Sequence, residues 1–155
     1  MTDSSSPLPT ADVIYMRMAL AEARKAFEAG EVPVGAVIVS SKGRVVGKGH
    51  NLTEALADVS AHAEMQAITA AASTLGGKYL TGCTLYVTVE PCLMCAGALG
   101  WSQISRVVYG APDVRRGYRS LMGTVSPFHP RTTVSAGVLE EECASLMKQF
   151  FRLRR

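Results

Sequence analysis

The sequence predicts an α/β fold in which helices cover both faces of a mixed β-sheet. Apolar residues recur at helical spacing near both ends of the chain, and short β-branched runs alternate with helical segments between them. The chain has 155 residues, of which 48% are hydrophobic and 19% are charged. This balance is typical of one globular domain. We therefore expect a single domain over residues 10–155, after a disordered tail rich in Ser and Pro over residues 1–9.

The first half of the chain predicts two helices that flank a β-hairpin. These elements are expected over residues 11–29 for the first helix, 35–40 and 44–49 for the hairpin, and 61–75 for the second helix. Thr10 or Asp12 is expected to cap the first helix, and Gly30 to end it. The second helix is rich in alanine and is expected to end at Gly76.

The second half predicts three strands and two helices. Strands are expected over residues 84–89, 106–109 and 132–134, and helices over 91–99 and 139–151. Pro91 suits the first position of a helix, where its missing N–H costs nothing. In the last helix Phe150 and Phe151 cannot both face the core, so we expect one of them to be exposed.

Composition narrows the possible environment and partners. No apolar run approaches the roughly 20 residues of a membrane span. The first residues lack a basic segment followed by an apolar one, so we expect no secretory signal and a cytoplasmic protein. Four cysteines in such a chain favour metal binding or catalysis over disulfides. Arginines cluster at residues 115–119 and 152–155, which indicates phosphate binding or simply a solvated surface.

Four residues in two short motifs carry the strongest functional signal, namely His62, Glu64, Cys92 and Cys95. One imidazole and two thiolates are three of the four ligands that zinc prefers in a tetrahedral site. A catalytic zinc keeps its fourth position open for water, so this set predicts a catalytic metal. The carboxylate is not needed as a ligand, and we expect it to move the protons of a zinc-activated water.

The spacing of the two motifs predicts where they lie. Cys92 and Cys95 are three residues apart and share one face of a helix. His62 and Glu64 are two apart and would diverge by about 200° in the middle of a helix. They can serve one site only at a helix N-terminus, where side chains and free N–H groups point the same way. The positive end of a helix also favours the thiolate form of Cys92. We therefore expect two helix N-termini to meet at one metal.

Two other interpretations of the cysteines stay open. A structural zinc would need a fourth ligand, for which the candidates are Cys83, Cys143, His50 and His129. The Cys-x-x-Cys pair could instead be a redox motif, which would leave the His and Glu of the other motif unexplained. Both Cys83 and Cys143 are expected to be small core residues.

The motif His62-Ala63-Glu64, together with residues 91–98, resembles the cytidine and deoxycytidylate deaminase superfamily. A closer resemblance, to the bacterial tRNA-specific adenosine deaminases, is carried by residues 31–36, 50–51, 84–92, 106–111, 120–122 and 150–152. It covers nearly the whole chain after residue 9. The resemblance implies a cytidine-deaminase-like fold: three α-β-α layers with a mixed five-stranded central sheet. It also implies one zinc-dependent deaminase domain over residues 10–155.

The resemblance implies hydrolytic deamination of adenosine to inosine at the wobble position, the first anticodon base of a tRNA. In that family zinc activates a water that attacks C6 of adenine, and the matching ligands here are His62, Cys92 and Cys95. Glu64 would take a proton from the water, deliver it to N1 and help ammonia leave. The positions that match the family's substrate contacts are Asn51, Ala63, Asp113, Phe151 and Arg152. Without the family, Asn51 would be taken for a turn residue.

The resemblance further implies a homodimer, for which exposed apolar residues of the metal-bearing helix, Met94, Leu99 and Trp101, are the expected interface. Two rival functions would use the same four residues. One is deamination of a free nucleobase or nucleoside of the guanine or cytosine type, and the other is a non-catalytic, zinc-stabilised RNA-binding module. Two loops depart from the family pattern. Residues 115–119 are more basic and bulkier, and Pro130 removes a backbone donor from residues 128–131, so their RNA contacts stay open.

Overall fold

The computed structural model describes residues 10–154, so the expected tail over residues 1–9 lies outside the described part of the chain. The elements are α1 (Ala11–Glu28), β1 (Gly35–Val39), β2 (Val45–His50), α2 (Ala63–Leu75), β3 (Thr84–Val89), α3 (Leu93–Trp101), β4 (Arg106–Ala111), α4 (Tyr118–Met122), β5 (Thr133–Ala136) and α5 (Glu140–Leu153). Every predicted element is present, with its ends shifted by at most two residues. The short helix α4 is the addition.

The five strands form one mixed sheet in the order β2-β1-β3-β4-β5. Strand β1 pairs antiparallel with β2 and β3, whereas the β3–β4 and β4–β5 pairs are parallel. The predicted hairpin and the mixed sheet are confirmed. Because β3 and β4 run in the same direction, the segments that follow them emerge at the same edge of the sheet.

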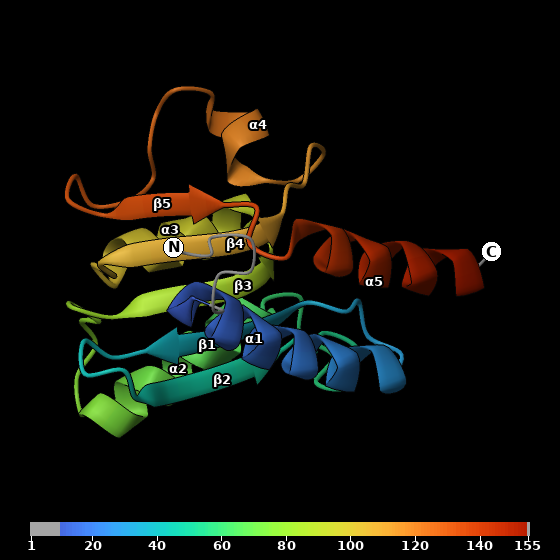
Figure 1. The fold of residues 1–155 in the computed structure, drawn as a ribbon, viewed down its shortest axis with the longest axis horizontal. Helices are drawn as coiled ribbons and strands as arrows, with labels where there is room; N and C mark the ends of the chain where they lie inside the picture. Colours follow the sequence, from blue (N-terminus) through green and yellow to red (C-terminus); the bar gives the residue numbers. More distant parts are fainter. Residues whose placement is uncertain (1–9, 155) are drawn as a thin grey trace, which may run out of the picture.

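Helices cover both faces of this sheet, and Figure 1 shows α1 and α5 on the near side with α2 and α3 behind. Two clusters of buried hydrophobic residues lie between the sheet and the helices, one on each face of the sheet. Alanines of α2 and Leu99 of α3 pack on one face, and Met16, Leu20 and Cys143 pack on the other. The expectation that Leu99 belongs to an exposed interface is wrong. Its side chain is 0% exposed, because it lies on the inward side of α3.

Glycines in β2 bring α2 unusually close to the sheet. A Cβ at Gly47 would collide with the backbone of Ala67 and Ala71, and one at Gly49 would collide with the carbonyl oxygen of Ala63. Close packing of this kind is a common reason for glycine within a strand. The first turn of α2 is therefore held directly against the sheet.

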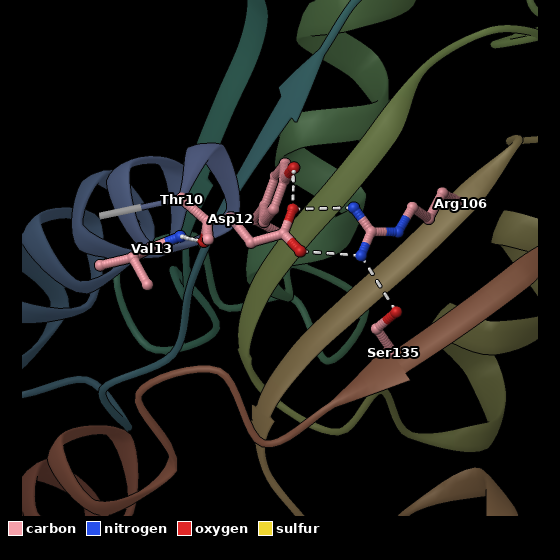
Figure 2. A network of polar contacts seen from close by, with 6 residues as sticks. Thr10, Asp12, Val13, Arg106 and Ser135 are labelled. Carbon is pink, nitrogen blue, oxygen red and sulfur yellow. Dashed lines mark hydrogen bonds and ion pairs between the residues drawn. The ribbon is translucent and has the colours of Figure 1, made fainter. Parts of the chain in front are cut away.

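A polar network ties the start of α1 to the sheet (Figure 2). Thr10, not Asp12, caps α1, since its hydroxyl accepts a hydrogen bond from the backbone N–H of Val13 at 3.3 Å. The carboxylate of Asp12 instead accepts two hydrogen bonds from Arg106, at 2.7 and 2.8 Å. It accepts a third from the hydroxyl of Tyr86 at 2.7 Å. Both oxygens of this carboxylate therefore accept hydrogen bonds from side chains of the β-sheet.

Helix α4 spans only five residues, which is too short to produce a periodic pattern in the sequence. Its first residue, Tyr118, packs edge-to-face on Phe128 with ring centroids 5.0 Å apart. Tertiary packing therefore stabilises a short helix that the local sequence does not predict. None of the helices in residues 10–154 is long and apolar enough to cross a membrane.

Candidate metal centre and active site

Two helix N-termini meet at the predicted metal site. His62 is the N-cap residue of α2 and Cys92 is the N-cap residue of α3, while Cys95 lies in the first turn of α3. The predicted meeting of two helix N-termini is confirmed. The prediction that Pro91 occupies the first position of this helix is wrong, because Cys92 still has extended backbone angles and α3 begins at Leu93.

The three side chains are close enough to share one ion. The Nδ1 atom of His62 lies 3.5 Å from the Sγ atoms of both Cys92 and Cys95. A tetrahedral zinc has Zn–S bonds of about 2.3 Å and Zn–N bonds of about 2.0–2.1 Å, which places neighbouring N and S ligands about 3.5 Å apart. The donor set and its spacing therefore fit a zinc ion.

Among residues 10–154, His62, Cys92 and Cys95 are the only group of at least three possible ligands within reach of one ion. The candidates for a fourth protein ligand lie elsewhere. Cys83 and Cys143 are buried in the two hydrophobic clusters, as predicted. His50 contacts Glu22 through Nδ1 at 3.2 Å. Three possible protein ligands fit a catalytic zinc, which would keep a fourth position open, better than a structural zinc, which would need a fourth protein ligand.

The two thiols and the imidazole change one another's pKa values. Hydrogen bonding from Cys95 and from His62 lowers the pKa of Cys92 to about 4. The Cys92 thiolate in turn raises the pKa of Cys95, because the second thiol keeps its proton beside a negative charge. The same thiolate raises the pKa of His62. A bound metal cation would take the place of that retained proton, since a coordinating thiol is deprotonated outright.

Glu64 lies in the first turn of α2, and only 3% of it is exposed. Burial raises the pKa of Glu64 to about 7, and the negative charge of Cys92 acts in the same direction. A carboxyl group with a pKa near neutrality can both accept and return a proton at physiological pH.

A cavity of about 250 Å³ lies in front of these groups. Its volume is near the small end of the range for small-molecule sites, roughly 300–1,000 Å³. The predicted site residues on its wall are Asn51, His62, Ala63, Glu64, Cys92 and Asp113. The structure therefore gathers most of the predicted site, which is drawn from several elements, around one space.

Asn51 and Asp113, two predicted substrate contacts on the cavity wall, also accept hydrogen bonds from nearby backbone N–H groups. The side-chain oxygen of Asn51 accepts a hydrogen bond from the N–H of Thr53 at 3.3 Å. Asp113 accepts hydrogen bonds from the backbone N–H groups of Arg115 and Arg116 at 3.1 and 3.0 Å. The turn role that the sequence alone suggested for Asn51 is thus present together with a position on the cavity wall.

Phe151 and Arg152 lie outside the cavity, on α5. They border a separate surface depression with Met147 and Lys148, and Met147 also lines the main cavity. Phe151 is 47% exposed whereas Phe150 is buried, which confirms that only one of this pair faces the core. Helix α5 extends past the sheet in Figure 1, and Met147 lies on both the depression and the cavity.

Several wall residues were not predicted from the sequence, namely Val32, Val34, Thr53, Val89, Glu90 and Met147. Met147 falls within the apolar stripe of α5 and is indistinguishable there from a core residue. Thr53 follows Asn51 by two residues, and Glu90 precedes Cys92 by two. Proximity to a motif was the only signal available for these last two.

The sequence and fold match known proteins. The family described as the cytidine and deoxycytidylate deaminase zinc-binding region matches residues 9–111. A tRNA-specific adenosine deaminase from Bacillus subtilis is 47% identical, over 92% of this chain and 90% of its own length. The chloroplastic tRNA(adenine(34)) deaminase of Arabidopsis thaliana is 45% identical over 94% of this chain, which spans only 12% of that longer protein.

Solved structures support the same assignment. One from work on A-to-I editing by tRNA:A34 deaminases at the wobble position of transfer RNA is 42% identical, with a TM-score of 0.79 over 86% of this chain and 98% of its own. A guanine deaminase from Bacillus subtilis is 38% identical, with a TM-score of 0.61 over 64% of this chain and 63% of its own. The chain therefore belongs to the cytidine and deoxycytidylate deaminase family, and within it the chain is similar to tRNA-specific adenosine deaminases.

Proposed function

We propose that this protein is a zinc-dependent tRNA adenosine deaminase, which converts adenosine to inosine at the wobble position and acts in the cytoplasm. One observation carries the proposal. A buried carboxylate with a pKa raised to about 7, that of Glu64, stands beside an open His/Cys/Cys metal site on the wall of one cavity. The similarity to tRNA-specific adenosine deaminases over most of both chains selects the substrate.

We assign His62, Cys92 and Cys95 as the ligands of one zinc ion, on the strength of their spacing and their donor atoms. When bound, the metal supplies a Lewis acid that lowers the pKa of a water molecule and makes it a nucleophile near neutral pH.

Glu64 is the proton carrier of the reaction. It takes a proton from the water that attacks C6 of adenine and delivers it to N1. Glu64 then takes the proton of the hydroxyl group formed on C6 and delivers it to the exocyclic amino group, which leaves as ammonia as the C6–N6 bond breaks and the C6 carbonyl of inosine forms. Burial favours this cycle, because the raised pKa keeps the protonated and ionised forms of Glu64 close in free energy at neutral pH.

The cavity accommodates a base, so the anticodon loop must present adenine splayed out of its stack. Asn51 and the backbone at Ala63 are placed on the wall to orient that base. Asp113, Phe151 and Arg152 are assigned to the neighbouring nucleotides, and the exposed arginines of the 115–119 segment supply positive charge for phosphates. Aromatic side chains such as Phe151 provide stacking surfaces for unstacked bases.

The active form is proposed to be a homodimer. Trp101 is 86% exposed, and Met94 on the same helix is also exposed, so α3 presents apolar surface beside the metal site. Large exposed apolar groups of this kind mark interaction surfaces. Gel filtration of Trp101→Glu should show a monomer, and full activity in that monomer would contradict a dimer-dependent site.

The function is tested with zinc-loaded protein and an anticodon stem-loop RNA that carries adenine at the first anticodon position. We expect one inosine per RNA, measured by nucleoside mass spectrometry, together with one ammonia. A stem-loop with guanine at that position and adenine beside it is the matched control, and it should stay unmodified.

The assay also separates the rivals. Ammonia released from a free guanine or cytosine base, without inosine in the RNA, would favour the nucleobase deaminase. RNA binding without any turnover would favour the non-catalytic module.

A further inference from the structure

We propose that Glu90 is a positioning residue, which holds the wall loop, residues 113–119, against the segment that carries Cys92. The inference rests on the proposed function, because it concerns how the cavity is shaped for a nucleotide substrate. Asp113 and Arg116 of the wall loop line the cavity. Glu90 thereby sets where a cation of the loop stands relative to the metal centre.

The carboxylate of Glu90 is fully engaged by the wall loop. Its Oε1 accepts hydrogen bonds from the backbone N–H of Asp113 at 3.1 Å and from Nη2 of Arg119 at 3.2 Å. Its Oε2 accepts one from the backbone N–H of Arg119 at 3.0 Å. The two oxygens therefore bind the first and the last residue of the loop. Glu90 borders the cavity, but its side chain is only 1% exposed, so it offers little surface for direct contact with a substrate.

The middle of the wall loop is attached to the same segment through backbone. Gly117 forms an antiparallel bridge with Cys92, and the N–H of Tyr118 donates to the carbonyl oxygen of Pro91 at 3.0 Å. A Cβ at Gly117 would collide with the carboxylate of Glu90, so only glycine permits this approach. The wall loop is thus attached to the three consecutive residues from Glu90 to Cys92, the last of which is a proposed metal ligand.

Metal binding and substrate binding are assigned to different segments. Cys92 is a proposed metal ligand, whereas the wall loop contributes the exposed cation of Arg116 at the cavity. Arg119 neutralises the charge of Glu90, so Glu90 does not compete with a phosphate for the cation of Arg116. Loss of the Glu90 contacts should therefore weaken RNA binding more than it slows the chemical step.

Glu90→Gln tests the inference with almost no change of volume. Each carboxylate oxygen accepts from a backbone N–H, so the new amide group faces a donor whichever way it is turned. In the zinc-loaded enzyme we expect amide hydrogen exchange across residues 113–119 to quicken by about tenfold, because one backbone donor of the loop loses its acceptor. The amides of Glu54 and Ala55, whose N–H groups donate to the carboxylate of Glu31, serve as the internal control and should not change.

Steady-state kinetics on the anticodon stem-loop give the functional readout. We expect KM to rise by about tenfold in Glu90→Gln, while kcat stays within about threefold and the zinc content is unchanged. Arg119→Ala removes only the half-exposed guanidinium and leaves the backbone contacts, so its KM should rise by less than about threefold. Glu141→Gln, at an exposed carboxylate on α5, should match the wild type.

Unchanged exchange across residues 113–119 in Glu90→Gln would overturn the inference. So would a loss of zinc accompanied by a fall in kcat at constant KM, which would make Glu90 a support of the metal ligands. If Glu90→Gln does not fold, Glu90→Asp takes its place, because the shorter side chain withdraws the carboxylate from the same backbone N–H groups: faster exchange across residues 113–119 supports the inference and unchanged exchange contradicts it. If the wild-type protein makes no inosine in the stem-loop, the proposed function fails, but the exchange measurement still decides the role of Glu90.

Discussion

Asp12 and Glu64 are both carboxylates in the first turn of a helix, yet the fold gives them opposite surroundings. Asp12 meets the guanidinium of Arg106 through two hydrogen bonds and the hydroxyl of Tyr86 through a third (Figure 2). Glu64 is more deeply buried, and its neighbours are His62 and the cysteine sulfurs. Within residues 10–154 it has no ion pair with a lysine or an arginine.

The two environments move the pKa values in opposite directions. The hydrogen bonds from Arg106 hold the pKa of Asp12 below its usual value. Burial raises the pKa of Glu64 to about 7. A paired carboxylate stays ionised and contributes to stability, whereas an unpaired buried one is costly to ionise and is available for proton transfer. Pairing with Arg106 thus suits Asp12 to a stabilising role, and burial without such a partner among residues 10–154 suits Glu64 to its proposed role in proton transfer.

Removing a proposed metal ligand should have the largest effect. Cys95→Ser replaces a thiolate by a poor zinc ligand, so we expect loss of the metal and a fall in deamination of at least about 10⁴-fold. The melting temperature should fall as well, since metal binding contributes to folding. Metal analysis and activity are measured on the same sample. Cys83→Ser, at a buried cysteine outside the site, is the control and should retain zinc.

Glu64→Gln should have the next largest effect, and it isolates the chemistry. We expect kcat to fall by about 10²–10⁴-fold, because the proton carrier is lost while the three ligands stay in place. Stability should not fall, since a buried group that is costly to ionise has been replaced by a neutral one. Substantial turnover in this variant would refute the proton-transfer role.

Asp12→Asn should show the reverse pattern. The free energy of unfolding should fall by about 1–2 kcal/mol, because a bidentate, partly buried pair with Arg106 is broken. We expect kcat to stay within about twofold of the wild type, since Asp12 does not line the cavity. Arg17→Gln, which breaks the exposed pair with Glu142, is the matched control and should change stability by less than about 0.5 kcal/mol. Urea denaturation and steady-state kinetics of both variants test whether Asp12→Asn lowers stability alone and Glu64→Gln lowers kcat alone.

The smallest effect concerns the pH dependence of that stability difference. The pKa of Asp12 is lowered in the folded state, so its stabilisation is present above the unfolded pKa of about 3.9 and is lost as the pH falls through the folded value. The difference between wild type and Asp12→Asn should be constant from pH 7 to about 5 and should narrow below about pH 4. A difference that is the same at pH 3 and pH 7 would contradict the role of the charged pair.

Much of the fold was accessible from the sequence because its signals are local. Hydrophobic periodicity and the Gly and Pro positions placed every predicted helix and strand to within two residues. The metal motifs were equally clear, because Cys-x-x-Cys and His-x-Glu carry their geometry in a few residues. Helix α4 was missed since one turn gives no period, and the Leu99 side chain was placed outside although it packs in the core.

The residues that shape the cavity were harder to foresee. Met147 reaches the cavity from the last helix, and Glu90 acts through a loop that begins more than twenty residues later. Nothing local distinguishes such positions from an ordinary helix stripe or a surface charge. Their roles depend on which segments lie next to one another.

By itself the sequence determined the types of element, the three proposed ligands and the carboxylate that accompanies them, because these follow from side-chain chemistry and short spacing. Only the tertiary structure decided that His62 and Cys92, thirty residues apart, would lie within 3.5 Å at two helix N-termini. The tertiary structure also decided that Asp12 pairs with Arg106, whereas Glu64 is buried, within residues 10–154, without a lysine or arginine partner. Burial and charge pairing depend on contacts between distant segments, and these contacts set the pKa values.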